Sequence, residues 1–335
     1  MNFLRKVLAQ YSVASLTVFT FLCSAHSYAA PMENPKFVDV NGIKTRYFEG
    51  GSGEAMLLVH GSHFGLTSSA YGWMPIFDHL ARHFHVYAID KLGMGYTDNP
   101  GKDSEYSMEA TIDHIYGFLR TLGIEKVHLV GASRGVLPVA RVAIDYPEMA
   151  DSLVFFDTGT LAPEDPTAPP RVRGRGSEST TPTKESIRQS MLASPSSKHK
   201  DYITDWYVEA QLRVALLPKI KEAEQKMSSL FSQWVRLNPE KRKKIPDFER
   251  TWWFYELKED TLELIRAGGL KAPTLIIWGY NDPSVSYTRG IELFKIINLA
   301  VKRSQLHLIN DCGHSPYAEY PQEVTRLVVN FIEGS

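Results

Sequence analysis

A serine between two glycines is the feature of this sequence that points most directly to chemistry. The segment 131–135 reads Gly-Ala-Ser-Arg-Gly, follows an apolar run and precedes a helical pattern. In a G-x-S-x-G turn between a strand and a helix, the serine takes strained backbone angles and its hydroxyl projects at the carboxyl edge of the sheet. Ser133 is therefore the predicted nucleophile. The alternative is a Gly-Ser-Gly turn that carries no chemistry.

A serine hydroxyl is a weak nucleophile, so a histidine from another loop at the same edge must act as its base. The chain has 11 histidines. His314 follows the apolar run 306–309, within a loop that would end at the carboxyl edge, whereas most of the others fall in helices, inside strands or in the first thirty residues. His314 is the predicted base. A purely structural role, capping the last helix or binding a loop carbonyl, is the alternative.

An acid that orients the histidine is expected between the serine and the histidine in chain order. Asp282 fits, because it follows the apolar run 274–278 in the segment Gly-Tyr-Asn-Asp-Pro. Asp157, which follows the run 153–156, is the second candidate. An aspartate before a proline is also an ordinary turn residue.

Two backbone amides are needed to stabilise the oxyanion that forms when the serine attacks a carbonyl. Arg134 supplies one amide as the residue after the nucleophile. The segment 59–63, Val-His-Gly-Ser-His, follows an early strand and supplies the other. Ser62 is the preferred donor, and His63 is the alternative.

The elements that must position these residues alternate along the chain. Strands are expected at 37–40, 43–48, 55–59, 86–90, 127–130, 153–156, 274–278 and 306–309, and helices at 71–84, 108–122, 135–144, 288–297 and 321–332. Asn41-Gly42 between the first two strands predicts a type I′ hairpin turn. The later alternation of strand and helix predicts an α/β fold whose central sheet is mostly parallel, with helices on both faces.

Residues 161–269 interrupt this alternation. They open with a Pro-rich linker, 166–175, and continue with helical patterns at 184–192, 202–216, 220–237 and 248–266. We therefore expect a core formed by residues 30–160 and 270–335, with an all-helical cap at 161–269. Trp252 and Trp253 begin an aromatic run that could line an apolar substrate pocket together with His63, although packing in the core is the more frequent role of such residues.

The first thirty residues have the order of a secretory signal. Arg5 and Lys6 precede an apolar stretch, and small residues follow, with a cleavage site expected after Ala29. Residues 1–29 are thus predicted to direct export to a periplasm or outside the cell, leaving no stable membrane insertion after cleavage. An uncleaved membrane anchor is the alternative. Cys312 would be the only cysteine of the mature chain, so no internal disulfide could form, and a small buried packing role is expected for it.

Composition narrows the class of partner. The formal net charge is −1, with basic and acidic residues interleaved, which argues against binding of nucleic acid. No CxxC or HExxH pattern indicates a metal site, and no cofactor is implied. A small-molecule substrate is the expected partner, and the sequence leaves the oligomeric state open.

These motifs resemble the α/β-hydrolase superfamily from about Phe37 to the end of the chain. Segment 90–100, Asp-Lys-Leu-Gly-Met-Gly-Tyr-Thr-Asp-Asn-Pro, and the loop around His314 are similar to the branch of meta-cleavage-product hydrolases, which split a carbon–carbon bond in ring-opened aromatic dienoates. That branch typically has asparagine before the serine, methionine after it and tryptophan after the histidine. This sequence has Ala132, Arg134 and Ser315 there.

The expected function is a serine hydrolase acting through an acyl-enzyme or related intermediate on a small, partly apolar ester, lactone or similar carbonyl compound. Carbon–carbon bond hydrolysis is the alternative, and it would call for a cap arginine such as Arg188 or Arg213 that faces the serine. A non-catalytic binding protein on the same fold is the alternative from another class. Dehalogenase and epoxide hydrolase activities, which resemble this fold, require an aspartate at the position of Ser133.

Overall fold

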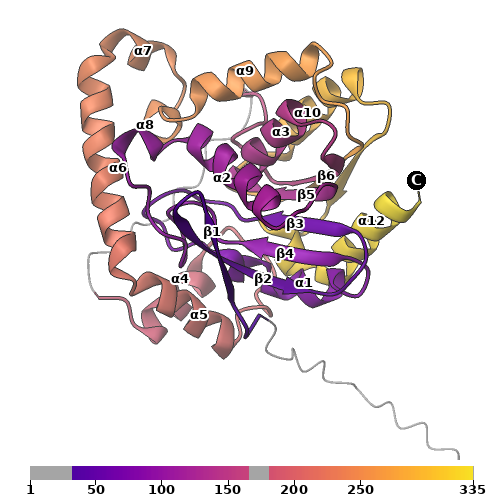
Figure 1. Ribbon diagram of the computed structural model, residues 1–335, viewed down its shortest axis with the longest axis horizontal. Coiled ribbons are helices and arrows are strands. Elements are labelled where there is room, and N and C mark those ends of the chain that lie inside the picture. The colour runs from indigo at the N-terminus through magenta and orange to yellow at the C-terminus, as the bar shows by residue number, and fades with distance from the viewer. Residues whose placement is uncertain (1–31, 166–180, 335) are drawn as a thin grey trace, which may run out of the picture. The chain divides into compact units, whose positions relative to one another are not determined.

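The computed structural model describes residues 32–165 and 181–334 (Figure 1). The predicted signal segment 1–29 and the predicted linker 166–175 both lie outside these residues. Among the described residues, no helix combines the length and the apolar character needed to cross a membrane.

An eight-stranded sheet forms the centre of the fold, in the order β1-β2-β4-β3-β5-β6-β7-β8. The strands are β1 (Lys36–Val40), β2 (Ile43–Gly50), β3 (Ala55–Val59), β4 (His85–Ile89), β5 (Val127–Ala132), β6 (Ala150–Phe156), β7 (Thr274–Gly279) and β8 (Ser304–Ile309). β2 pairs antiparallel with both β1 and β4, and all other pairs are parallel. The predicted mostly parallel α/β sheet is confirmed.

The hairpin between β1 and β2 turns where the sequence predicted. Asn41 and Gly42 have φ angles of 52° and 86°, the two positive values that a type I′ turn requires. Val40 pairs with Ile43 directly across the turn. The hairpin places β2 beside β4, at one edge of the parallel part of the sheet.

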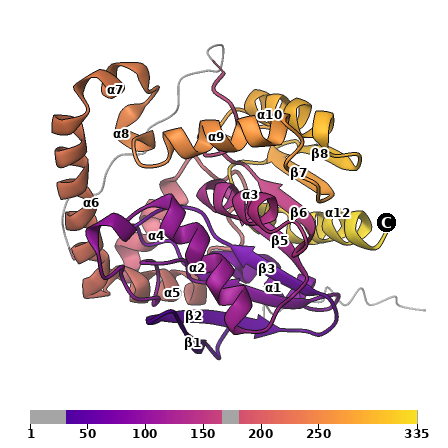
Figure 2. The ribbon, with the colours of Figure 1, turned by 45° about the horizontal axis from the view of Figure 1, so that its top comes forward.

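Helices cover both faces of the sheet (Figure 2). One face carries α2 (Met108–Thr121), α3 (Val136–Asp145), α9 (Tyr255–Arg266) and α10 (Tyr287–Ala300), and the other carries α1 (Met74–Leu80), α11 (Pro316–Glu319) and α12 (Pro321–Glu333). Along β3, Leu57 and Val59 pack toward the first group, whereas Met56 and Leu58 pack toward the second. Burial of alternate residues on opposite faces explains why the central strands are continuous apolar runs.

Six helices lie between β6 and β7 within the described part of the predicted cap region, residues 161–165 and 181–269. They are α4 (Lys184–Ala193), α5 (Asp205–Ala215), α6 (Pro218–Leu237), α7 (Pro239–Lys244), α8 (Phe248–Thr251) and α9. Figures 1 and 2 show α4 and α5 near one end of the long helix α6, and α7 and α8 at its other end, while α9 lies over α3 and α10. Within the predicted cap region, α9 packs on the same face of the sheet as α3.

Four helices differ from the sequence prediction, and one of them is α11, a single short turn before α12 that was not expected. The helix expected at 71–84 begins as a short 3₁₀ turn, η1 (Ala70–Trp73), and its α-helical part ends at Leu80. The helix expected at 248–266 is broken by a turn at residues 252–254. The short helix α7 was not predicted, because its sequence, Pro-Glu-Lys-Arg-Lys-Lys, has no apolar face.

Candidate active site

The turn after β5 holds Ser133 in a strained conformation. Its φ angle is 50°, a left-handed value that a residue with a side chain seldom adopts. A Cβ atom on Gly131 would lie 2.7 Å from the carbonyl oxygen of Gly135, and one on Gly135 would lie 2.2 Å from that of Val59. Both glycines are thus required for the close approach of backbone segments that presents Ser133 at the end of the strand.

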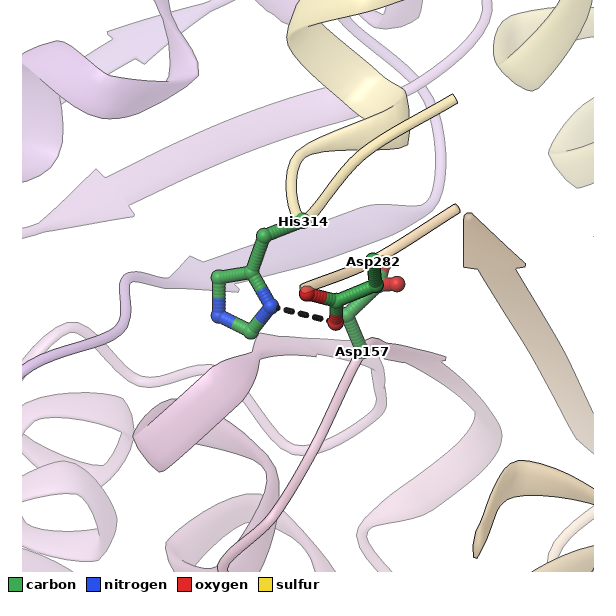
Figure 3. Close-up of side chains that lie close together, drawn as sticks. All are labelled: Asp157, Asp282 and His314. Atoms are coloured by element: carbon green, nitrogen blue, oxygen red, sulfur yellow. Dashed lines mark hydrogen bonds and ion pairs between the residues drawn. The ribbon is translucent and has the colours of Figure 1, made fainter. Parts of the chain in front are cut away.

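His314 and Asp282 form a direct pair at the carboxyl edge of the sheet (Figure 3). Nδ1 of His314 lies 2.7 Å from Oδ2 of Asp282, whose side chain is fully buried. The other carboxylate oxygen, Oδ1, accepts the amide of Ser284 at 2.7 Å. Because a carboxylate only accepts hydrogen bonds, Nδ1 carries the proton, and Nε2 of His314 is left to receive one.

Asp157, the second candidate for the acid, lies beside this pair but does not contact the histidine through a hydrogen bond. Its Oδ1 accepts the amide of Gly279 at 2.8 Å, and its buried Oδ2 has no partner among the described residues. Burial, and next the charge of Asp282, raise the pKa of Asp157 well above its usual value. Burial thus disfavours a charge on Asp157, and Asp282 is the acid whose carboxylate oxygen contacts His314.

Within the described residues, Asp157, Asp282 and His314 also form a cluster of side chains that could in principle bind a metal ion. Their ligand atoms lie within 4.8 Å of one another. Nδ1 of His314 and Oδ2 of Asp282 are in direct hydrogen-bond contact, so a metal ion cannot sit between them without breaking that contact. The arrangement matches a base and its orienting acid better than a metal centre.

Ser133 and His314 both line a cavity of about 670 Å³. No hydrogen bond joins the Ser133 hydroxyl to His314 within the described residues, a common state of such pairs before substrate binds. The remaining walls mix polar, charged and apolar side chains: Gly61, Ser62, Leu66, Ser68, Arg134, Gly159, Thr160, Glu164, Asp165, Asp247, Arg250, Thr251, Phe254, Ser284, Val285, Ser286, Arg289 and Tyr317.

The loop after β3 contributes the predicted oxyanion segment. A Cβ atom on Gly61 would lie 3.0 Å from Cβ of Ser133, so this loop passes directly over the nucleophile. Ser62 has a φ angle of 68° and lines the cavity. The structure therefore brings Ser62 and Arg134, the two predicted amide donors, to the same wall as Ser133.

His63 is turned away from that cavity and lines a second one of about 360 Å³, together with Trp252 and Trp253. Burial, followed by the charge of Arg134, lowers the pKa of His63 to about 3, so its imidazole is neutral. Its ring packs edge-on against Trp253 at 5.7 Å. The two cavities share Leu66, Arg134 and Arg250 as wall residues, so they adjoin each other.

The arginine on the cap side of the first cavity is Arg250, which the sequence analysis did not single out. Arg188 instead pairs with Asp205, and Arg213 lies over the ring of Trp206, so neither lines the cavity. Phe254, which belongs to the predicted aromatic run that begins at Trp252, does line the first cavity. Because the chain turns at 252–254, Phe254 lines the first cavity and Trp252 lines the second.

The loop that carries His314 is fastened to the beginning of the cap. The His314 amide donates to the carbonyl of Ser196 at 2.6 Å. Glu319 accepts the amides of Gly313, Lys198 and His199 at 3.0, 2.7 and 3.1 Å. One carboxylate thus bridges the histidine loop and the cap. Cys312, in the same loop, is fully buried, as the packing role predicted for it requires.

Comparison with known proteins agrees with this architecture. The family model for the alpha/beta hydrolase fold matches residues 54–321. The chain belongs to the α/β-hydrolase family, and it is an enzyme of the hydrolase class, as the sequence predicted.

Among its relatives, a 2-hydroxy-6-oxo-6-(2'-aminophenyl)hexa-2,4-dienoic acid hydrolase of Metapseudomonas resinovorans is 27% identical over 89% of this chain and 90% of its own length. A 2-hydroxy-6-oxo-2,4-heptadienoate hydrolase of Pseudomonas putida is 26% identical over 89% of this chain and 95% of its own length. The solved structure of a meta-cleavage product hydrolase from Pseudomonas fluorescens is 26% identical, with a TM-score of 0.65, over 89% of this chain and 97% of that one. The predicted similarity to this branch is confirmed.

Proposed function

We propose that this protein hydrolyses a carbon–carbon bond next to a ketone in a small, anionic, ring-opened dienoate. The observation that carries the proposal is that one cavity contains both the Ser133 and His314 pair and a cap arginine, Arg250. The two relatives described above are named as hydrolases of such dienoates. A guanidinium group on the cap side is suited to hold the carboxylate of such a substrate.

The chemistry follows from the positions of the side chains. Ser133 adds to the ketone carbonyl while Nε2 of His314 takes its proton, and Asp282 stabilises the imidazolium that forms. The amides of Ser62 and Arg134 receive the oxyanion. In the 2-oxo tautomer of the substrate, the carbon–carbon bond then breaks, its electron pair is delocalised toward the conjugated 2-oxo group, and His314 returns the proton to the leaving carbon. Water hydrolyses the acyl group from Ser133 and restores the enzyme.

The decisive experiment is turnover of 2-hydroxy-6-oxo-6-phenylhexa-2,4-dienoate by the purified protein, followed by loss of the dienoate absorbance and by release of benzoate. Ser133→Ala is expected to abolish turnover. Arg250→Met is expected to raise KM for the dienoate about tenfold or more, because one charge-assisted hydrogen bond contributes about 1.5–3 kcal/mol. The same variant should leave KM for neutral p-nitrophenyl butyrate within about twofold, since this ester has no carboxylate to hold.

Ester or lactone hydrolysis is the second candidate. It is favoured by Ala132, Arg134 and Ser315, which stand where the carbon–carbon hydrolases typically carry asparagine, methionine and tryptophan. Turnover of p-nitrophenyl esters without any turnover of the dienoate would select this function. If neither substrate is turned over and a fluorophosphonate does not label Ser133, both candidates fail.

We also propose that residues 1–29 direct export and that the mature chain begins at Ala30. The support is the basic, apolar and small-residue order of this segment. Cell fractionation and N-terminal sequencing of the protein expressed in a Gram-negative host test the proposal. A full-length chain in the cytoplasm would contradict it, and a full-length chain in the membrane fraction would select the anchor instead.

A further inference from the structure

Lys91 is a buried lysine whose charge has no acidic partner. Four cationic side chains are buried among the described residues: Arg46, Lys91, Lys258 and Arg289. Three of them form ion pairs, Arg46 with Asp90 and both Lys258 and Arg289 with Glu164. Lys91 is only 3% exposed and forms no ion pair with a described carboxylate. Burying an unpaired cation is costly, so its position calls for an explanation.

The neighbouring acid is already occupied. The carboxylate of Asp90 accepts Nε of Arg46 at 2.6 Å and the amides of Ala70 and Tyr96 at 2.7 and 2.8 Å. Nζ of Lys91 instead donates to the carbonyl oxygen of Ser62 at 2.8 Å. Burial, and next the charge of Arg134, lower the pKa of Lys91 to about 7, and both its charged and its neutral forms can donate this bond.

The carbonyl that Lys91 holds belongs to the proposed oxyanion loop. In a planar trans peptide the C=O and N–H groups point in opposite directions. Fixing the carbonyl of Ser62 therefore also fixes the direction of the His63 amide. On the preceding peptide, Nδ1 of His60 donates to the carbonyl of Gly61 at 2.9 Å, which fixes the Ser62 amide in the same way. Nε2 of His60 accepts the backbone amide of Lys91 at 3.2 Å, a bond that does not involve the Lys91 side chain.

Holding these carbonyls has an electronic effect as well. A donor on a peptide oxygen draws electron density through the amide, and this strengthens its N–H group as a donor. The amides of Ser62 and His63 donate no hydrogen bond to another described residue, so they remain able to bind an oxyanion. Ser62 also has a φ angle of 68°, a conformation that needs support from its surroundings.

We propose that Lys91 is a positioning residue of the oxyanion hole. Through the carbonyl of Ser62 it fixes the His63 amide and holds Ser62, whose own amide is the other donor of this loop, at its φ angle of 68°, without touching the substrate. The inference rests on the proposed function, because it requires that Ser133 attack a carbonyl. This role predicts a kinetic effect on kcat and not on KM. Removal of the Lys91 amine should weaken stabilisation of the tetrahedral intermediate while leaving binding of the planar substrate unchanged.

The test compares Lys91→Met with a matched control, Lys219→Met. Nζ of Lys219 also donates to a backbone carbonyl, that of Gly95 at 3.2 Å, but in a loop that carries no proposed oxyanion donor. Both changes remove one bond between a lysine and a carbonyl. Each variant is assayed with p-nitrophenyl butyrate and for its rate of fluorophosphonate labelling, after its melting temperature is measured.

Lys91→Met is expected to lower kcat by about 10- to 100-fold, somewhat less than direct loss of an oxyanion donor, and to slow labelling of Ser133 by a similar factor. KM should stay within about twofold, as should the affinity of the Ser133→Ala/Lys91→Met protein for the dienoate. Lys219→Met should retain the wild-type kcat.

A Lys91→Met protein that keeps kcat within about twofold of Lys219→Met overturns the inference, and so does a loss that appears only in KM. If Lys91→Met does not fold, Lys91→Leu, which likewise lacks a donor, is judged by the same criteria. A wild-type protein that is not labelled and turns over neither substrate refutes the proposed function itself. A labelled, active wild type with an unaffected Lys91→Met refutes only the role of Lys91.

Discussion

Replacing Asp282 by asparagine should disable the base through the wrong tautomer of His314. The amide of Ser284 donates to Oδ1 of Asp282 at 2.7 Å and requires an oxygen there. In Asp282→Asn the carboxamide oxygen must keep this bond, so its NH₂ group faces Nδ1 of His314. Nδ1 then accepts a hydrogen bond and the proton moves to Nε2, which can no longer receive the proton of Ser133.

The size of the effect can be worked out from the pair itself. At the 2.7 Å separation of Nδ1 and Oδ2, a unit charge pair contributes about 6 kcal/mol at an effective dielectric constant of about 20. Misorientation of the histidine in a serine triad lowers kcat by about 10⁴-fold, or about 5.5 kcal/mol. The two figures agree, so kcat for p-nitrophenyl butyrate should fall by about 10³- to 10⁴-fold, with KM little changed.

Asp157→Asn is the matched control. Its Oδ1 accepts the amide of Gly279, a bond that an asparagine oxygen can also accept, and Asp157 makes no hydrogen bond to His314. We expect kcat within about threefold of wild type. An Asp282→Asn protein that keeps more than a tenth of the wild-type kcat, or an Asp157→Asn protein as slow as Asp282→Asn, would refute the assignment of Asp282 as the orienting acid.

Three further predictions concern stability. Burial lowers the pKa of His114 to about 4, so on acidification the unfolded chain is protonated at this position before the folded chain. The free energy of unfolding is therefore unaffected by His114 above about pH 6.5 and decreases as the pH falls toward 4. In urea titrations, wild type should be less stable at pH 5 than at pH 7, and His114→Gln should remove about 2 kcal/mol of that difference. In the same assay, Arg46→Met should lower the free energy of unfolding by about 3–5 kcal/mol, because it leaves the Asp90 carboxylate buried without its cation. A smaller loss would show that the backbone amides bonded to Asp90 are enough to stabilise its buried charge. Gly135→Ala should lose about 3 kcal/mol or more, since the new Cβ would lie 2.2 Å from the carbonyl of Val59; a stable, active variant would contradict the required close approach.

Much of the core could be predicted because its signals are local. The central strands are buried on both faces and appear as short apolar runs, and residues that follow such runs must meet at one edge of a parallel sheet. The positions of Ser133, Asp282 and His314 directly after such runs therefore predict that they lie on one side of the fold. The sequence favours Asp282 but does not exclude Asp157, because both follow strands and only the loop geometry directs Asp157 to the amide of Gly279.

The cap was harder to predict, for a physical reason. Which arginine faces the cavity depends on how short helices pack, and the turn at 252–254 that brings Arg250 and Phe254 to the site follows an apparently regular helical pattern. The importance of Lys91 was equally hidden, since its sequence motif says nothing about burial or about the missing acidic partner. Periodicity reports which face of a helix is apolar, but it does not report what that face meets.

The bridge made by Glu319 has a consequence for protein engineering. A cap on an α/β-hydrolase is often treated as an exchangeable module, to be trimmed or grafted to change specificity. Here Ser196 accepts the amide of His314 itself, and Glu319 ties Gly313 to Lys198 and His199. A chimaera that imports a foreign cap must therefore retain residues 196–199, because a graft that omits them would change the scaffold of the base along with the specificity.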